Sequence, residues 1–182
     1  MAELAIESRV GLLQGEYRVS DNPGLVITTI LGSCVAACLR DPQARVGGMN
    51  HFLLPGKTQR APDQEAERYG VHLMELLVNG LLHLGAKRNR LEAKLFGGAR
   101  IVEGLSDVGA MNVRFAKHFL EVEGIKLIGG SVEGTRGRRV EFRPVSGRAR
   151  QIFIDRVETP ELSVRPLPPP KPQAPSGVVE FF

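Results

Sequence analysis

The residue best placed for covalent chemistry is Cys34, which directly follows Gly32 and Ser33. A glycine and a small polar residue allow a tight turn, and such a turn leaves backbone N–H groups close to the sulfur. These groups lower the pKa of a thiol and stabilise the oxyanion that forms when a thiolate attacks a carbonyl. The sequence therefore offers Cys34 as a nucleophile and the backbone of Gly32 and Ser33 as an oxyanion site.

A histidine further along the chain could activate that cysteine. His51 follows Cys34 by 17 residues and lies in residues 46–54, which we expect to be extended. Antiparallel pairing across a turn at Asp41 and Pro42 would bring the two side chains into one neighbourhood. A Cys–His pair is the minimum needed for an activated thiolate nucleophile.

The alternative for Cys34 is a purely structural one. Free cysteine is often a small buried hydrophobe, and the apolar run at residues 35–39 is typical of a core strand. Cys38 lies inside that run, and two cysteines four residues apart on a strand are too far separated for a disulfide. The two cysteines and four histidines show no spacing typical of a metal site, so we expect no bound metal.

The secondary-structure elements that must position these residues follow from two spacings of apolar residues along the chain, one helical and one extended. Apolar residues recur at helical spacing in residues 63–84 and again in residues 108–122, with Gly85 and Gly124 as the stops. Extended segments are expected at residues 17–20, 25–29, 34–39, 46–54, 91–96, 125–128 and 152–154, the last in a closing hairpin. This order predicts an α+β fold: a mixed or antiparallel β-sandwich-like core with two main helices.

The C-terminal residues have a composition of their own. Seven of the twelve prolines lie in this stretch, and proline sustains neither a helix nor a central strand. We therefore expect one domain over residues 1–157 and an extended, proline-rich tail over residues 158–182. The tail ends in an apolar cluster with Phe181 and Phe182, which is a frayed end, packs back onto the domain or serves as a short docking peptide.

Composition and charge narrow the class of protein. The 182 residues are 42% hydrophobic and 24% charged, with no apolar run near the roughly 20 residues that span a bilayer. With two cysteines and no secretory signal, we expect a soluble cytoplasmic protein without membrane insertion. The net charge of +4 is concentrated in residues 136–150, where six arginines accompany one glutamate. That segment could be a docking face for an acidic surface, a solvated hairpin or a nucleic-acid-binding module.

Several motifs together resemble the CheD family of chemoreceptor glutamine deamidases. They are Asn22-Pro23-Gly24, the run that begins at Thr28 and ends in LGSCVA, Asp41-Pro42, and GMNHFLLP at residues 48–55. The resemblance extends over roughly residues 15–147 and leaves the tail outside. Residues 91–98 are similar to the family's strand and glycine turn, and residues 134–142 to its arginine-rich segment. The departures are Met111, where relatives carry an arginine, and a reduced glycine pair at Glu133-Gly134.

The resemblance implies a cysteine amidohydrolase that converts protein glutamine to glutamate and needs no cofactor. Carried over by position, the nucleophile is Cys34, the base is His51 and the third catalytic residue is Thr28. The adjacent Thr29 is the second choice for that third position. The implied route runs through a thioester and would also accept a glutamyl methyl ester.

The implied substrate is the long, commonly acidic helical hairpin in the cytoplasmic part of a chemoreceptor, and the implied regulator is a CheC-type phosphatase. Substrate or partner contacts are then expected at Arg136, Arg138, Arg139, Phe181 and Phe182. In this interpretation the arginine segment binds protein rather than nucleic acid. The competing hypothesis is a non-catalytic adaptor that binds the phosphatase or the receptor.

Overall fold

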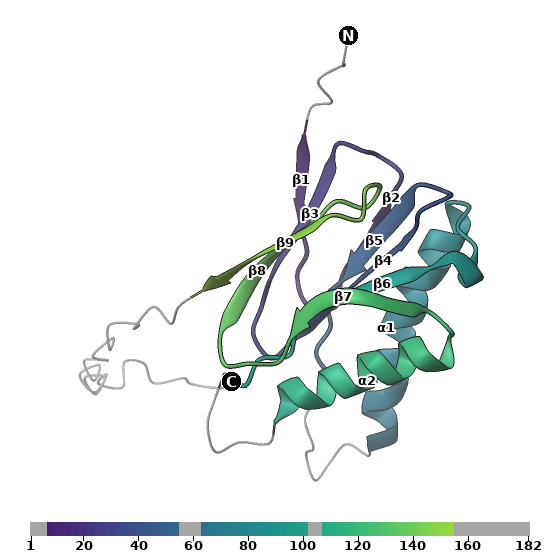
Figure 1. Cartoon of the computed structure of the whole chain (residues 1–182). Helices are drawn as coiled ribbons and strands as arrows, with labels where there is room; N and C mark the ends of the chain where they lie inside the picture. Colours follow the sequence, from purple (N-terminus) through teal and green to yellow (C-terminus); the bar gives the residue numbers. More distant parts are fainter. Residues whose placement is uncertain (1–6, 55–62, 102–106, 155–182) are drawn as a thin grey trace, which may run out of the picture.

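The protein, seen in a computed structural model that describes residues 7–54, 63–101 and 107–154, consists of two β-sheets and two helices (Figure 1). The strands are β1 (Ser8–Gly11), β2 (Tyr17–Ser20), β3 (Leu25–Leu31), β4 (Val35–Asp41), β5 (Val46–Asn50), β6 (Glu92–Gly97), β7 (Lys126–Val132), β8 (Gly137–Phe142) and β9 (Ala149–Ile154). The helices are α1 (Asp63–His83) and α2 (Val108–Val122), and a short 3₁₀ turn, η1, spans Arg88–Arg90.

The sheets pack face to face, and both helices cover the outer face of the larger one. The four-stranded sheet has the order β1-β3-β8-β9, and the five-stranded sheet has the order β2-β5-β4-β6-β7. Most neighbours are antiparallel, while β1 with β3 and β6 with β7 are parallel. Figure 1 shows the resulting layers: the four-stranded sheet, the five-stranded sheet, and then α1 and α2. The predicted α+β sandwich-like core with two main helices is confirmed.

The helices end where glycine permits the chain to leave them. Gly85 and Gly124 adopt φ of +92° and +66°, a conformation that costs glycine little. The N–H groups of Ala86 and Ile125 then reach back to carbonyls of the last helical turns. At the start of α2, the Asp107 carboxylate accepts from the Ala110 N–H. Both predicted glycine stops are confirmed.

The alternation of side chains along β4 divides the interior into two cores. Val35, Ala37 and Leu39 pack with the helices, whereas Ala36 and Cys38 point into the layer between the sheets. The inter-sheet core is completed by apolar residues from β3, β6 and β8: Ile27, Leu31, Phe96, Val140 and Phe142. Because side chains alternate along β4, Cys34 faces the inter-sheet layer, as Ala36 does.

Asp41 fixes the turn between β4 and β5. Its carboxylate accepts from the N–H groups of Gln43 and Ala44 within the turn, and from Lys87 N–H and the Arg90 guanidinium outside it. The predicted turn and the antiparallel pairing across it are confirmed, with Cys38 opposite Met49.

Two strands differ from what the sequence predicts. β1 was not expected, and it pairs in parallel with β3. β7 runs to Val132, beyond the extended residues 125–128 that the sequence predicts. The proline-rich tail, with Phe181 and Phe182, and the domain boundary at residue 157 lie outside the described residues. Across the part of the chain that the structure describes, no helix is long and apolar enough to cross a membrane.

Candidate active site

The register of β4 and β5 brings Cys34 and His51 to the same face of the sheet. Beyond the end of β5, Val35 and Phe52 form an antiparallel bridge in which each N–H donates to the other's carbonyl at 2.9 Å. Cys34 and His51 each precede one member of this bridge, so they are diagonal neighbours on the same face. Such neighbours lie about 7–8 Å apart at their Cα atoms. The pair therefore sits at one end of the inter-sheet layer.

The turn at residues 32–34 is held by its carbonyls. Those of Gly32 and Cys34 accept from the N–H groups of Ala99 and Gly98 at 2.8 and 2.7 Å, and the Ser33 carbonyl accepts from the Asn112 side chain at 3.0 Å. In a trans peptide the N–H points opposite to the preceding carbonyl. The N–H groups of Ser33 and Cys34 therefore face away from these contacts, and the Cys34 N–H is directed at its own Sγ. They form a candidate oxyanion site.

Asn112 is a further member of the site that the sequence does not reveal as such. It is fully buried on α2, where its Nδ2 donates to Ser33 and its Oδ1 accepts from the Leu54 N–H at 2.9 Å. It thus ties the turn before Cys34 to the segment after His51. One sequence feature could have indicated this role: Asn112 is a polar residue four positions before Ala116, on a helix face that is otherwise apolar.

His51 is buried and held by one ring nitrogen. The Thr29 hydroxyl donates to the Leu12 carbonyl at 2.9 Å and lies 2.8 Å from His51 Nδ1. Because a hydroxyl has a single hydrogen, its oxygen accepts from Nδ1–H, which leaves Nε2 as the basic nitrogen. Nε2 is buried and has no hydrogen-bond partner in the described residues. Burial lowers the pKa of His51, against a smaller raising effect of the Leu12 carbonyl.

The threonine that contacts His51 is Thr29 and not Thr28. The resemblance implied Thr28 first and Thr29 second for the third catalytic position. Alternate residues of β3 point to opposite faces, and Ile27 and Leu31 share the inward face with Thr29. The Thr28 side chain belongs to the other face, together with Ile30. Thr28 nevertheless lines a hollow of about 490 Å³ next to the histidine, which we call the His51 hollow.

The Cys34 thiol is engaged by a residue of the β1–β2 connection. Sγ donates to Gln14 Oε1 at 3.7 Å, and no hydrogen bond joins Cys34 to His51 in the described residues. Burial raises the pKa of this half-buried thiol above its ordinary 9.0, with an opposing effect of its own backbone N–H. Both members of the pair are therefore neutral at pH 7. Nothing in the sequence around Gln14 indicated this contact.

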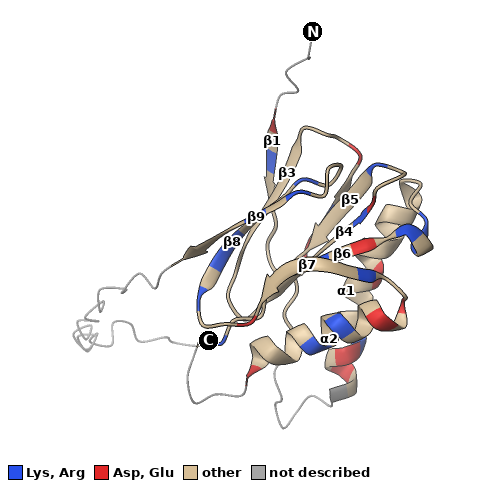
Figure 2. Ribbon diagram, viewed as in Figure 1, with Lys and Arg blue, Asp and Glu red and all other residues tan. Residues whose placement is uncertain are grey.

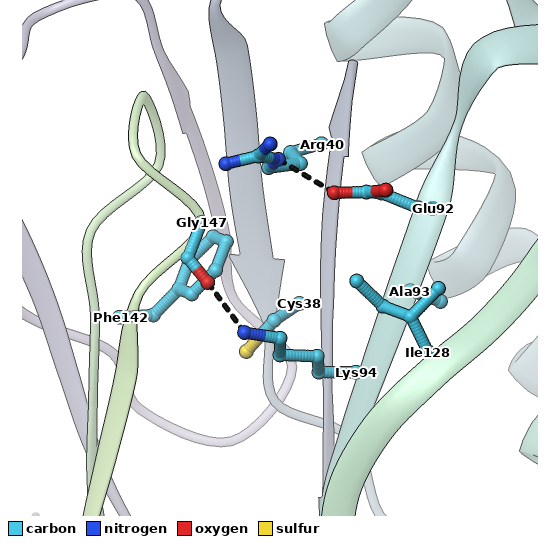
Figure 3. Close-up of a pocket in the computed structure, with 8 residues that line it drawn as sticks. All are labelled: Cys38, Arg40, Glu92, Ala93, Lys94, Ile128, Phe142 and Gly147. Carbon is cyan, nitrogen blue, oxygen red and sulfur yellow. Dashed lines mark hydrogen bonds and ion pairs between the residues drawn. The ribbon is translucent and has the colours of Figure 1, made fainter. Parts of the chain in front are cut away.

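Cys38 is unsuited to the same role. Figure 3 shows it beside Lys94 and Phe142 in a small cavity between the sheets. Lys94 Nζ donates to the Gly147 carbonyl at 2.7 Å, which closes this end of the sandwich. Burial raises the pKa of Cys38 strongly, and the charge of Lys94 offsets little of that effect. Both cysteines are free.

The three arginines expected to contact a partner are placed differently. Figure 2 shows the basic residues of β8 on the four-stranded sheet, away from the helices. Arg138 is 1% exposed, and its guanidinium donates to the carbonyls of Ser131 and Glu133. Both Arg136 and Arg138 stack on Phe153. Because Arg138 is buried, it offers no surface contact, whereas Arg139 is exposed and lines the His51 hollow.

Two further expectations concern metals and the departure at Met111. No group of three metal-ligating side chains occurs within residues 7–54, 63–101 and 107–154. Met111 packs against the core beneath the helices.

Comparisons with known proteins show which family the chain is similar to. A family model described as CheD chemotactic sensory transduction matches residues 53–151. A relative from Agrobacterium fabrum is 56% identical over 181 residues, covering 98% of each chain. One from Rhizobium leguminosarum bv. trifolii is 57% identical over 178 residues, covering 96% of each chain. One from Caulobacter vibrioides is 53% identical over 174 residues, covering 96% of this chain and 93% of its own. All three carry the name "Probable chemoreceptor glutamine deamidase CheD".

Proposed function

The chain belongs to the CheD family, and we propose that it deamidates glutamine side chains of chemoreceptors, with Cys34 as nucleophile and His51 as base. The observation that carries the residue assignment is His51 itself. Its Nδ1 is held by Thr29, while its buried Nε2 has no partner on the inter-sheet face that also carries Cys34. A histidine fixed in this tautomer beside a cysteine is equipped to accept the thiol proton.

The reaction begins when Gln14 releases the thiol and the Sγ proton moves to His51 Nε2. The thiolate attacks the carbonyl carbon of the substrate carboxamide, which forms a C–S bond and places a negative charge on the oxygen. The N–H groups of Ser33 and Cys34 stabilise this oxyanion. His51 then protonates the departing nitrogen, and ammonia leaves a thioester.

Hydrolysis of the thioester completes the cycle. His51 Nε2 takes a proton from water, the resulting hydroxide attacks the thioester carbonyl, and the C–S bond breaks. Glutamate is released and the thiolate regains its proton. The same steps would convert a glutamyl methyl ester with methanol as the leaving group, so we include a weaker methylesterase activity in the proposal.

The resemblance implies Thr28 as the third catalytic residue, and this proposal gives that role to Thr29, which positions His51. Thr28 instead contacts the substrate from the wall of the His51 hollow. The substrate is the cytoplasmic part of a receptor, and a CheC-type phosphatase regulates the enzyme. A contact of that partner with Phe181 and Phe182 would fall outside the described residues.

The test is ammonia release from a purified chemoreceptor cytoplasmic fragment, with mass spectrometry to locate new glutamates. Wild type should convert specific glutamines, and Cys34→Ser and His51→Ala should abolish the conversion. Cys38→Ala is the matched control, because it removes the other cysteine of the same strand and should retain turnover. If wild type is as inert as Cys34→Ser on several receptors, the adaptor hypothesis replaces this one.

A further inference from the structure

The His51 hollow opens onto the face of the four-stranded sheet that no described helix covers. Its walls include Leu13 and Ile30, which are 73% and 55% exposed, and its rim carries Arg139. Both described helices lie on the other sheet, as Figure 1 shows. The opening to the base is therefore flanked by large apolar side chains in contact with solvent.

Strand register extends this surface away from the hollow. Ile30 of β3 lies opposite Arg139 of β8, and Arg139 lies opposite Ile152 of β9. Residues directly opposite in antiparallel strands share a face. Ile152 is 46% exposed, so the row presents an apolar, a cationic and an apolar side chain in succession. We call Leu13, Ile30, Arg139 and Ile152 the docking row.

The cation of this row has no partner of its own. Arg9 pairs with Glu141 at 2.7 Å, and Arg143 pairs with Glu7 at 2.6 Å, so two neighbouring arginines on the same sheet are already neutralised. No ion pair or hydrogen bond of the Arg139 side chain is found in the described residues. A carboxylate from a bound protein would complement Arg139 without displacing an existing contact.

The spacing of the row matches one face of an α-helix. Adjacent strands lie about 4.8 Å apart, so Ile30 and Ile152 are separated by about 10 Å. On a helix, residues i and i+7 are about 10.5 Å apart along the axis, with i+3 and i+4 between them. A helix lying across the strands would thus place apolar residues at i and i+7 over the two isoleucines. It would also place residue i+3 or i+4 over Arg139.

We propose that the docking row binds the receptor helix next to its target glutamine, with an acidic residue of that helix on Arg139. This inference rests on the proposed function and adds the recognition element. The receptor helix continues past Ile30 toward Leu13. The target glutamine lies on that helix one turn before the residue that packs over Ile30, and its side chain enters the His51 hollow. Recognition therefore requires an apolar residue about one turn after the glutamine, and a carboxylate about one turn further.

The experiment measures kcat and KM for deamidation of a receptor cytoplasmic fragment by single variants. Arg139→Glu should lower kcat/KM by about tenfold or more, mainly through KM, because the change acts on binding. Arg150→Glu is the matched control: it makes the same charge change on an exposed residue of β9, opposite Glu141 and outside the row. It should change kcat/KM by no more than about threefold.

A charge swap tests the pairing directly. Changing the acidic residue about two turns after the modified glutamine to lysine should weaken the wild-type enzyme and restore turnover by Arg139→Glu. For the apolar contacts, Leu13→Asp should raise KM, whereas Val122→Asp at the equally exposed end of α2 should not. Alkylation of Cys34 by iodoacetamide at an unchanged rate would show that each variant keeps its site.

The outcomes separate the two proposals. If wild type converts no receptor glutamine, the proposed function fails. If wild type is active but Arg139→Glu and Arg150→Glu behave alike, or the charge swap does not restore turnover, the docking row is refuted and the proposed function stands.

Discussion

Replacing Thr29 by valine should separate the role of this residue from that of its neighbour Thr28. Valine keeps the shape of threonine but removes the hydroxyl that binds both His51 Nδ1 and the Leu12 carbonyl. Thr29 is only 4% exposed, so its hydroxyl is held by these two contacts rather than by bulk solvent. Because Nδ1–H can turn toward the Leu12 carbonyl, we expect a modest loss of about 1–2 kcal/mol of unfolding free energy.

The catalytic effect should be larger than the effect on stability. Without the hydroxyl, the imidazole keeps a basic Nε2 only by turning Nδ1–H toward the Leu12 carbonyl, which moves Nε2 away from its position beside Cys34. General base catalysis depends on that position and contributes typically about 10²–10⁴-fold. We expect kcat to fall by about 10- to 100-fold with little change in KM, and Thr29→Ser to restore most of it. Thr28→Val, on the opposite face of β3, should leave kcat within about threefold and act on KM, because Thr28 lines the His51 hollow.

Ammonia release under saturating receptor fragment measures kcat, and urea unfolding of each variant measures stability. The reasoning is refuted if Thr28→Val loses kcat while Thr29→Val retains it. It is also refuted if Thr29→Ser is as slow as Thr29→Val, because a side chain that acts only by filling space would behave in that way.

Three further expectations concern single titrating or hydrogen-bonding groups. Because burial lowers the pKa of His51, kcat/KM should rise with pH through a pKa below 6.5. It should then stay level up to about pH 8, where Cys34, whose pKa burial raises above 9.0, still holds its proton. An acid limb centred above pH 7 would contradict this. Burial raises the pKa of Asp41, but Arg90 and three backbone N–H groups outweigh it and bring the value to about 2. About 2 kcal/mol of stability should therefore be present above pH 3.8 and be lost as the pH falls toward 2, and urea unfolding of Asp41→Asn should lack this dependence. Because Gln14 binds the Cys34 thiol, Gln14→Ala should speed alkylation of Cys34 severalfold and Gln14→Glu should slow it. Peptide mass spectrometry measures the alkylation rates, and equal rates would mean that the contact with Gln14 has no effect on the thiol.

The sequence predicts those parts of the fold that depend on local chemistry. Gly85 and Gly124 end their helices because only glycine adopts a positive φ there without strain. The turn at Asp41 follows from a side chain that accepts from the backbone two and three residues ahead. The pairing of the strands on either side then places Cys34 near His51, because strand register has a period of two.

Long-range pairing explains what the sequence could not predict. β1 is a four-residue strand whose only partner among the described strands is β3, which lies beyond an intervening strand, so no local pattern indicates it. The choice between Thr28 and Thr29 depends on which face of β3 meets the other sheet. Gln14 reaches Cys34 only because the connection after β1 passes over the turn.

The three residues of the site come from different sheets. Cys34 and His51 belong to the end of the five-stranded sheet, while Thr29 belongs to β3, whose neighbours are β1 and β8. A ribosome has synthesised the cysteine, the histidine and the threonine by residue 51, but β8 emerges only with residues 137–142. β3 pairs with β8, and β4, which positions Cys34, pairs with β6, so each half of the site depends on a strand made later in the sequence. The complete site therefore requires the chain as far as the closing hairpin.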